Sequence, residues 1–487
     1  MNILFCASEA VPFAKTGGLA DVASALAKSL SKMGHEVSLF MPRYPMVDLT
    51  CYNLKIIFDD VEIALGEDKY NVSFFEGKIP GSEVVVYFVD SEDFFTSYNG
   101  LYQIEGKDIE ENLERFSLYS KALFFLLRLL ENKPHIIHVN DWQCGLIPAY
   151  LKILYKDDPL FSPMASVFTI HNLAYQGVFS KKKFDLLGLP EFCLENEALG
   201  YGNSFSLLKS GLVYADIINT VSTTYAQEIQ TPELGFGLDA LLKKRKSDLF
   251  GIINGVDYSL WDPKHDKVIT KRYSHQTLSL KQENKWALQK KQNLKPDPQI
   301  PLLGIISRLC DQKGFDTLAK SMDDLMGLNV QLVVLGTGDA KYHQIFEALK
   351  EKFPKQLGVN LGFDSAMAEE IYAGCDMFLM PSHYEPCGLG QLISFKYGTV
   401  PIVRKTGGLA DTVIDYTEDP KKGRGFVFEE PKDFIPAVKR ALNLFQKDAF
   451  HWLELQKRIM TLDFSWDASA KEYITLYSKA LDKINNR

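Results

Sequence analysis

Short apolar runs alternate along the chain with segments in which apolar residues recur at helical spacing. In the first half these runs open the sequence and recur at 84–89, 136–139, 166–170 and 217–221. A short run followed by a helical segment is typical of a βα unit, and a series of such units builds a parallel sheet covered by helices. The pattern therefore predicts a doubly wound α/β fold in which the loops after the strands carry the ligand sites.

The alternation is interrupted once, and this interruption divides the chain. Near residue 250 the sequence becomes polar and rich in lysine, and apolar runs return only at 302–307. Later runs lie at 330–335, 377–380 and 400–403. Because 487 residues exceed what one hydrophobic core organises, we expect two Rossmann-like domains with parallel sheets, residues 1–250 and 251–465. A cleft between them is then available for an active site.

One heptapeptide occurs in both halves. Lys15 to Asp21 and Lys405 to Asp411 share the sequence Lys-Thr-Gly-Gly-Leu-Ala-Asp, and each copy follows an apolar run and opens a helical segment. Such a glycine turn directs helix N-terminal N–H groups toward a phosphate or a carboxylate. Two chance helix starts are the alternative, but seven identical residues favour two related domains whose glycine turns face one cleft.

Composition excludes several classes of protein. Hydrophobic residues make up 46% of the chain and charged residues 24%, as in ordinary globular proteins, and no apolar stretch approaches the ~20 residues of a membrane span. Seven cysteines without a Cys-x-x-Cys pair argue against a disulfide framework or structural zinc. A net charge of −8 disfavours nucleic acid as a partner. The N-terminal run meets Glu9 without a basic segment, so we expect no signal peptide and a cytoplasmic protein.

Three cations lie at predicted turns: Lys15 beside Gly17 and Gly18, and Arg308 with Lys313 after the run 302–307. Fixed cations and helix N–H groups can stabilise a departing diphosphate, a task that other enzymes give to a carboxylate-bound Mg²⁺. The chain contains no Asp-x-Asp motif. The sequence therefore favours fixed cations, with no metal and no cofactor, although solvated side chains at helix starts are the alternative.

Two carboxylates and a histidine also follow apolar runs. Glu385 lies in a glycine-containing polar segment just after 377–380, where a carboxylate can bind sugar hydroxyls or stabilise an oxocarbenium centre. Asp141 and His171 stand at the ends of two runs in the first half. The alternatives are a helix N-terminal acid for Glu385 and a structural role for the histidine.

Taken as a set, these motifs resemble the ADP-glucose-dependent bacterial glycogen synthases and starch synthases. The matching stretches keep the family's order over nearly the whole chain, and the set is highly specific. They are Lys-Thr-Gly-Gly-Leu-Ala-Asp at 15, Asp-Trp-Gln at 141, His-Asn-Leu-Ala-Tyr-Gln-Gly at 171, Asn-Gly-Val-Asp at 254, Ser-Arg-Leu at 307, Glu-Pro-Cys-Gly-Leu at 385 and Thr-Gly-Gly-Leu-Ala-Asp at 406.

The resemblance implies a GT-B fold with the active site in the cleft and a C-terminal helix, residues 466–487, that crosses back to the first domain. It implies that the diphosphate is held by Arg308 and Lys313 and that the glucosyl group is wrapped by the Glu385 loop. The residues implied to be catalytic are Asp141, His171, Arg308, Lys313 and Glu385. The residues implied to bind substrate are Lys15, Gly17, Gly18, Asp21, Tyr102, Asn172, Asn254, Cys387, Gly388 and Leu389.

The activity implied is a metal-independent, retaining transfer of glucose from ADP-glucose to the 4-hydroxyl at the non-reducing end of an α-1,4-glucan such as glycogen. A covalent intermediate and same-face attack within an ion pair both stay open. The alternatives are a GT-B transferase for another nucleotide sugar, such as a sucrose- or trehalose-type synthase, and a noncatalytic glucan-binding protein. The joint presence of Lys15, Arg308, Lys313 and Glu385 speaks against the noncatalytic protein. We expect neither nucleic acid nor membrane among the partners.

Three positions depart from the family pattern. Asn140 replaces a common histidine, Gly390 replaces the usual threonine after Glu-Pro-Cys-Gly-Leu, and Ile393 replaces the second glutamate of related retaining transferases. Without the threonine hydroxyl, the loop loses a donor and becomes costlier to order. We therefore expect weakened donor binding, and a lower donor KM in Gly390→Thr.

Overall fold

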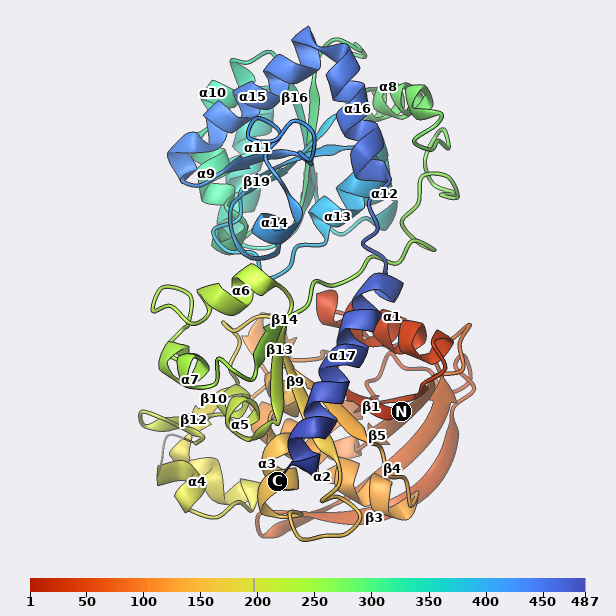
Figure 1. Cartoon of the computed structure of the whole chain (residues 1–487), viewed down its shortest axis with the longest axis vertical. Coiled ribbons are helices and arrows are strands. Elements are labelled where there is room, and N and C mark those ends of the chain that lie inside the picture. The colour runs from red at the N-terminus through yellow and green to blue at the C-terminus, as the bar shows by residue number, and fades with distance from the viewer. Residues whose placement is uncertain (105, 196–197, 487) are drawn as a thin grey trace. The chain divides into compact units, whose positions relative to one another are not determined.

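The computed structural model describes residues 1–104, 106–195 and 198–486, which form two compact units (Figure 1). Unit 1 comprises Met1–Val221, Ala226–Gly255 and Trp466–Arg487, and unit 2 comprises Ser222–Tyr225 and Val256–Ser465. Each unit has its own large β-sheet with helices packed against it. The α/β class predicted from the sequence is confirmed.

The sheet of unit 1 has the strand order β14-β13-β9-β8-β1-β2-β5-β4-β3. Neighbours from β14 to β5 run parallel, whereas β4 is antiparallel to both β5 and β3. The strands are β1 (Asn2–Cys6), β2 (Glu36–Pro42), β3 (Lys55–Leu65), β4 (Asp68–Lys78), β5 (Val85–Asp90), β8 (Ile136–Asn140), β9 (Ala165–Ile170), β13 (Ile217–Thr220) and β14 (Leu249–Gly251). The apolar runs of the first half thus correspond to β1, β5, β8, β9 and β13.

The β3–β4 hairpin extends this sheet beyond the parallel pattern that the sequence predicts. Strand β3 lies at the sheet edge and leaves most of its residues exposed or half-buried, including Asp59, Asp60 and Glu62. A half-solvated edge strand needs no continuous apolar run, so hydrophobic patterning gives no signal for it. Two smaller antiparallel groups complete the strands of this half: β6 (Gln103–Ile104) with β7 (Lys107–Asp108), and β10 (Val178–Ser180) with β11 (Gly200–Tyr201) and β12 (Ser204–Ser206).

The helices of the first half follow the βα rhythm. They are α1 (Gly18–Lys32), α2 (Asn112–Leu129), α3 (Leu146–Ile153), α4 (Phe192–Glu195), α5 (Leu207–Tyr214), α6 (Thr223–Glu228) and α7 (Asp239–Lys244). Helix α1 follows the first glycine turn and buries Val22, Leu26 and Leu30, which recur at helical spacing.

The C-terminal helix α17 (Trp466–Asn485) packs against α1 and against β8, β9 and β13 of unit 1 (Figure 1). Its Tyr477 hydroxyl lies 2.9 Å from Nδ1 of the buried His138, whose Nε2 lies 2.7 Å from Oγ1 of Thr169. Burial lowers the pKa of His138 to about 3, so the ring is neutral. Buried hydrogen bonds therefore fasten the last helix of the chain to strands of the first half.

The sheet of unit 2 is wholly parallel, with the order β17-β16-β15-β18-β19-β20. Its strands are β15 (Leu302–Ile306), β16 (Gln331–Gly336), β17 (Leu357–Leu361), β18 (Met377–Met380), β19 (Val400–Arg404) and β20 (Phe426–Phe428). Its helices are α8 (Lys281–Lys291), α9 (Phe315–Lys320), α10 (Met322–Met326), α11 (Ala340–Lys352), α12 (Ser365–Gly374), α13 (Gly390–Lys396), α14 (Gly407–Thr412), α15 (Phe434–Lys447) and α16 (Ala449–Met460). The four apolar runs predicted for this half correspond to β15, β16, β18 and β19.

The lysine-rich stretch before β15 belongs to the packed structure of unit 2. Lys281 on α8 is buried and donates to the carbonyl oxygens of Tyr372 and Ala373, while Lys285 forms a 2.7 Å ion pair with Asp376. Burial lowers the pKa of Lys281 to about 7. Helical segments across the described part of the chain are all too short or too polar to cross a membrane.

Candidate active site

The first glycine turn leaves room beside the start of α1. A Cβ added to Gly18 would meet no atom within 4 Å, and one added to Gly17 would lie 3.4 Å from Oε1 of Glu9. Lys15 forms a 2.7 Å ion pair with Asp21, and about half of the Lys15 side chain is exposed. A ligand can therefore approach this turn closely, and its charged groups are at the surface.

The Glu9 carboxylate is hydrogen-bonded to the first glycine turn. Its Oε2 accepts hydrogen bonds from the backbone N–H groups of Thr16 and Gly17 and from the Thr16 hydroxyl. The side chain is buried, and this burial raises its pKa. Glu9 was not among the predicted site residues, because from the sequence it served only to interrupt the N-terminal apolar run. A carboxylate between a strand and a glycine turn is the signal that could have found it.

Asp141 and His171 meet at the ends of the neighbouring strands β8 and β9. Oδ1 of Asp141 accepts the backbone N–H of His171 at 2.8 Å. Burial raises the pKa of Asp141 to about 7, and the nearby Glu9 carboxylate adds to this shift, while the backbone N–H groups of His171 and Asn172 oppose it. Asp141 also has a φ of 56°, an uncommon conformation for a residue other than glycine.

The ring of His171 is neutral and its orientation is fixed. Its desolvation lowers the pKa to about 3. Nε2 lies 2.9 Å from Oδ1 of Asn140, and Nδ2 of the same amide donates to the carbonyl oxygen of Cys6. Because the amide oxygen must accept, Nε2 of His171 carries the proton. Asn140, one of the departures from the family pattern, thus acts here as the acceptor that orients His171.

The remaining predicted residues of unit 1 fall into two places. Tyr102 lies close to Asp141 and Glu9, and its hydroxyl is 2.6 Å from that of Ser8. Asn172 accepts the backbone N–H of Ala174 through its side-chain oxygen, beside His171. Asn254 follows β14 instead, and its buried Oδ1 has no hydrogen-bond partner within the described residues. Such an unsatisfied acceptor is costly unless water or a ligand binds it.

In unit 2, two residues predicted for different parts of a donor form one ion pair. Nζ of Lys313 lies 2.8 and 2.7 Å from the two carboxylate oxygens of Glu385, and the Ser382 hydroxyl donates to Oε2 at 3.0 Å. Glu385 is only 5% exposed. Cys387 and Gly388 continue the same loop, Gly388 with a φ of 74°, and Leu389 caps α13.

Arg308 lies on the adjacent loop, after β15, and is exposed. The next residue, Leu309, pairs with the loop that follows β16, because its N–H donates to the carbonyl oxygen of Thr337. Phe363, after β17, reaches this same end of the sheet and is 88% exposed, and the N–H of Gly362 donates to the carbonyl oxygen of Gly336. An aromatic ring left this exposed at the carboxyl edge of a parallel sheet suits stacking with a flat ligand group. Sequence analysis missed Phe363 because β17 was not predicted.

The second glycine turn is filled by protein. A Cβ on Gly407 would lie 1.9 Å from the carbonyl oxygen of Glu385, and one on Gly408 would lie 1.9 Å from that of Cys387. Lys405 pairs with Glu429 at 2.7 Å. Asp411 accepts hydrogen bonds from the Ser222 hydroxyl and from the backbone and side chain of Thr224. This copy supports the Glu385 loop.

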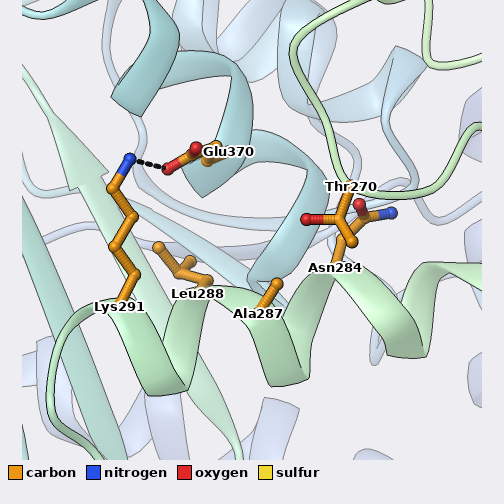
Figure 2. Close-up of a pocket in the computed structure, with 6 residues that line it drawn as sticks. All are labelled: Thr270, Asn284, Ala287, Leu288, Lys291 and Glu370. Atoms are coloured by element: carbon orange, nitrogen blue, oxygen red, sulfur yellow. Dashed lines mark hydrogen bonds and ion pairs between the residues drawn. The ribbon is translucent and has the colours of Figure 1, made fainter.

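A cavity of about 110 Å³ lies elsewhere in unit 2, between α8 and α12 (Figure 2). Its lining residues are Thr270, Asn284, Ala287, Leu288, Lys291 and Glu370, and Lys291 and Glu370 form a 2.7 Å ion pair at its rim. None of these is a predicted site residue. Across the part of the chain that is described, no group of three or more His, Cys, Asp or Glu residues is placed to hold a metal ion.

Comparison with known proteins gives matches to both halves of the chain. Residues 2–244 match the family model described as "Starch synthase catalytic domain", and residues 284–458 match "Glycosyl transferases group 1". A glycogen synthase of Thermotoga petrophila is 44% identical over 490 residues, covering 99% of this chain and 100% of its own. One from Syntrophotalea carbinolica is 45% identical over 484 residues, covering 99% of each chain.

Two solved structures are also similar. The catalytic domain of Starch Synthase IV from Arabidopsis thaliana, bound to ADP and acarbose, superposes with a TM-score of 0.91 at 33% identity over 99% of each chain. Sucrose-phosphate synthase from Thermosynechococcus elongatus gives a TM-score of 0.60 at 18% identity over 98% of each chain, which shows a shared fold alone.

Proposed function

The chain belongs to the glycogen synthase family of GT-B glycosyltransferases, and on that premise we propose that it transfers glucose from ADP-glucose to the non-reducing end of an α-1,4-glucan, with retention and without a metal ion. That it is a glucosyltransferase of glycogen synthesis follows from full-length relatives. The donor, the stereochemistry, the metal independence and the residue roles are the proposal.

The observation that carries the proposal is the Lys313–Glu385 ion pair, in which the carboxylate is buried and the lysine half-buried. A carboxylate held by Lys313 and Ser382 at the carboxyl edge of unit 2 has a fixed orientation, and it can accept hydrogen bonds from glucosyl hydroxyls. The ammonium of Lys313 is held at the same place and, with Arg308, can stabilise the negative charge that develops on a departing diphosphate. The Lys313–Glu385 pair can thus act on the glucosyl group and on the diphosphate, the two groups joined by the bond that breaks, and no metal is needed.

Unit 2 also offers a place for the nucleotide. We assign the adenine to the exposed ring of Phe363, since base–aromatic stacking suits any purine. The Arabidopsis relative is bound to ADP and acarbose, which supports the same nucleotide and a glucan-like acceptor here. Residues 251–465 are accordingly proposed as the nucleotide-sugar domain and residues 1–250 as the acceptor domain, with residues 466–487 as its returning helix.

In unit 1, Asp141 and Glu9 supply negative charge and Lys15 supplies positive charge. Ionised Asp141 can stabilise the oxocarbenium character of the glucosyl group, while neutral His171, fixed by Asn140, can accept at Nδ1 from a sugar hydroxyl. Tyr102, Asn172 and the open turn at Gly17 and Gly18 are assigned to substrate contacts. Asn254, with its unsatisfied oxygen, is assigned to the donor pocket.

For the chemical step we propose attack on the face from which the diphosphate departs. The C1–oxygen bond to the diphosphate breaks, the acceptor O4 bonds to C1, and the O4 proton passes to the departing diphosphate oxygen. Glu385 is a poor nucleophile for the covalent alternative, because Lys313 binds both of its oxygens and Ser382 binds one of them. The seven cysteines form no disulfide within the described residues, which supports a reducing compartment, the cytoplasm.

The test is incubation of the purified chain with radiolabelled ADP-glucose and glycogen in the presence of EDTA, followed by linkage analysis of the product. We expect new α-1,4 linkages, undiminished by EDTA and much weaker with UDP-glucose or GDP-glucose. Activity that is lost on chelation and restored by Mg²⁺ would refute the metal-free proposal. A preference for another nucleotide sugar would refute the donor assignment.

A further inference from the structure

We propose that His383 is a positioning residue that fixes the Glu385 loop by bridging the loops on either side of it. The proposal rests on the function proposed above, because Lys313 and Glu385 are taken to act on the donor. His383 was not among the residues predicted to be functional, and within the described residues it forms no hydrogen bond to Lys313 or Glu385.

Three loops of unit 2 meet at this histidine. They follow β15, β18 and β19, which are consecutive neighbours in the sheet, so their carboxyl ends lie side by side. The first loop carries Lys313 and leads into α9 with Asp316, and the second carries His383 and Glu385. The third is the second glycine turn, which Arg404 at the end of β19 precedes.

The side chains form a chain of hydrogen bonds across these loops. Nε2 of His383 lies 2.6 Å from Oδ1 of Asp316, and its Nδ1 lies 3.1 Å from NH1 of Arg404. Arg404 is itself held, because its Nε donates to the carbonyl oxygen of Glu429 at 2.9 Å. The backbone N–H of His383 donates to the carbonyl oxygen of Gln312 at 2.8 Å, so both the ring and the main chain tie this loop to its neighbour.

The chemistry of the partners fixes the state of the imidazole. A guanidinium can only donate, so Nδ1 of His383 must accept from Arg404, and Nε2 must carry the hydrogen that binds Asp316. These partners favour one tautomer, with the hydrogen on Nε2. A side chain that offers both an acceptor and a donor can replace it, whereas a side chain that only donates cannot.

Backbone packing shows how little freedom the Glu385 loop has. A Cβ on Gly314 would lie 1.9 Å from the carbonyl oxygen of Pro381, and one on Gly407 would lie equally close to that of Glu385. The loop is thus clamped between its two neighbours, and His383 supplies the side-chain link across both. A small displacement of Glu385 would misplace the group that meets the glucosyl moiety, and displacements near 1 Å can cost about 100-fold in rate.

The experiment compares His383→Ala, His383→Gln and His451→Ala in steady-state kinetics with ADP-glucose and glycogen, together with calorimetric binding of ADP. The amide of glutamine can accept from Arg404 and donate to Asp316. His451 on α16 forms a similar 2.7 Å contact with Asp448, the residue before that helix, and is therefore the matched control. We expect His383→Ala to lower kcat by about 10- to 100-fold while ADP affinity changes less than about threefold. We expect His383→Gln to recover most of the rate, and His451→Ala to match the wild type.

A second variant tests the link itself. Asp316→Ala should reproduce the loss, and the double variant with His383→Ala should be no slower than either single variant, because one connection is broken in each case. Wild-type kinetics in His383→Ala, no recovery with glutamine, or additive losses in the double variant would each overturn the proposal. A wild-type chain that fails to use ADP-glucose would instead overturn the proposed donor, and the ratios would then be measured with the donor it does use.

Discussion

The two copies of Lys-Thr-Gly-Gly-Leu-Ala-Asp show how one sequence serves two purposes in the same chain. In the first copy, Gly18 borders open space, and Lys15 pairs with Asp21 of its own turn. In the second copy, Gly407 and Gly408 contact protein backbone. Both copies start a helix after a strand, so local sequence dictates the turn, and the surroundings decide whether a ligand or a loop fills it.

The carboxylates beside the two turns also differ, both in their burial and in the direction of their pKa shifts. Burial raises the pKa of Glu9, which caps the first turn, whereas hydrogen bonding to Lys405 lowers the pKa of the exposed Glu429 beside the second. A buried group with a raised pKa is held at a cost, which is common where chemistry needs it. This difference supports the proposal that the first turn binds substrate, whereas the second turn contacts the Glu385 loop.

The largest difference that we expect between the two turns is in the free energy of unfolding of glycine-to-alanine variants. Gly408→Ala places a Cβ 1.9 Å from the carbonyl oxygen of Cys387, so the Glu385 loop must move, and we expect a loss of about 4 kcal/mol in unfolding free energy. Gly18→Ala meets no neighbour and adds helix propensity, so its stability should be unchanged or higher by up to ~1 kcal/mol. Differential scanning calorimetry measures both. Equal losses in the two variants would mean that the turns are equivalent.

Asp141, next to the capped turn, gives the next largest effect. Asp141→Asn should lower kcat by about 100-fold or more, since it removes the charge that we propose stabilises the transition state. Its pKa in the folded chain, about 7, lies above the ordinary 3.8. The folded state therefore binds the proton more tightly than the unfolded state, and the stability that this provides below pH 4 is lost as the pH rises through 7.

Asparagine at position 141 cannot ionise, so the variant avoids the free-energy cost of holding a buried carboxylate in its charged form above pH 7. We therefore expect Asp141→Asn to be more stable than the wild type at pH 8 and close to it at pH 4, as measured by urea denaturation. In the wild type, kcat should fall as the pH drops below about 7. A variant that is less stable at pH 8 would show that the carboxylate contributes to folding rather than to catalysis.

Lysines at equivalent positions of the two turns provide a smaller test. Lys15→Ala should lower kcat/KM for the donor, with a loss of about 2 kcal/mol of transition-state stabilisation, because we propose that its ammonium contacts the negative charge of the substrate. Lys405→Ala should stay close to the wild type, since its ion pair with Glu429 is exposed on both sides. Steady-state kinetics under identical conditions decide. Equal effects on kcat/KM would refute the functional difference between the turns.

Much of this arrangement could be predicted from the sequence, and the remainder depends on contacts that sequence does not encode locally. Apolar runs located most of the parallel strands because buried strands are continuously hydrophobic, but the parallel strands β2, β14, β17 and β20 were not predicted, and neither was the half-solvated edge strand β3. From the sequence, Asp141, His171, Lys313 and Glu385 were each expected just after a strand, and the structure adds that Asp141 contacts His171 and that Lys313 pairs with Glu385. The pairing of Lys313 with Glu385 and the bridge at His383 join residues from separate segments, so only the folded chain reveals them.

Gly390 provides the smallest test, and here the structure changes the expectation drawn from the sequence. The missing threonine suggested that Gly390→Thr would lower the donor KM. A Cβ at this position would lie 2.9 Å from the buried ring of Phe378, so the glycine, like Gly407 and Gly408, accommodates protein. We now expect Gly390→Thr to lower the free energy of unfolding by about 1 kcal/mol, which lowers the Tm by roughly 2–4 °C, and to leave the donor KM no lower than in the wild type. Gly390→Ala is the matched control, because it adds the Cβ without the hydroxyl. A donor KM several-fold lower in the threonine variant than in the alanine variant would restore the hydroxyl as a donor contact, and would show that the Phe378 ring yields without moving the Glu385 loop.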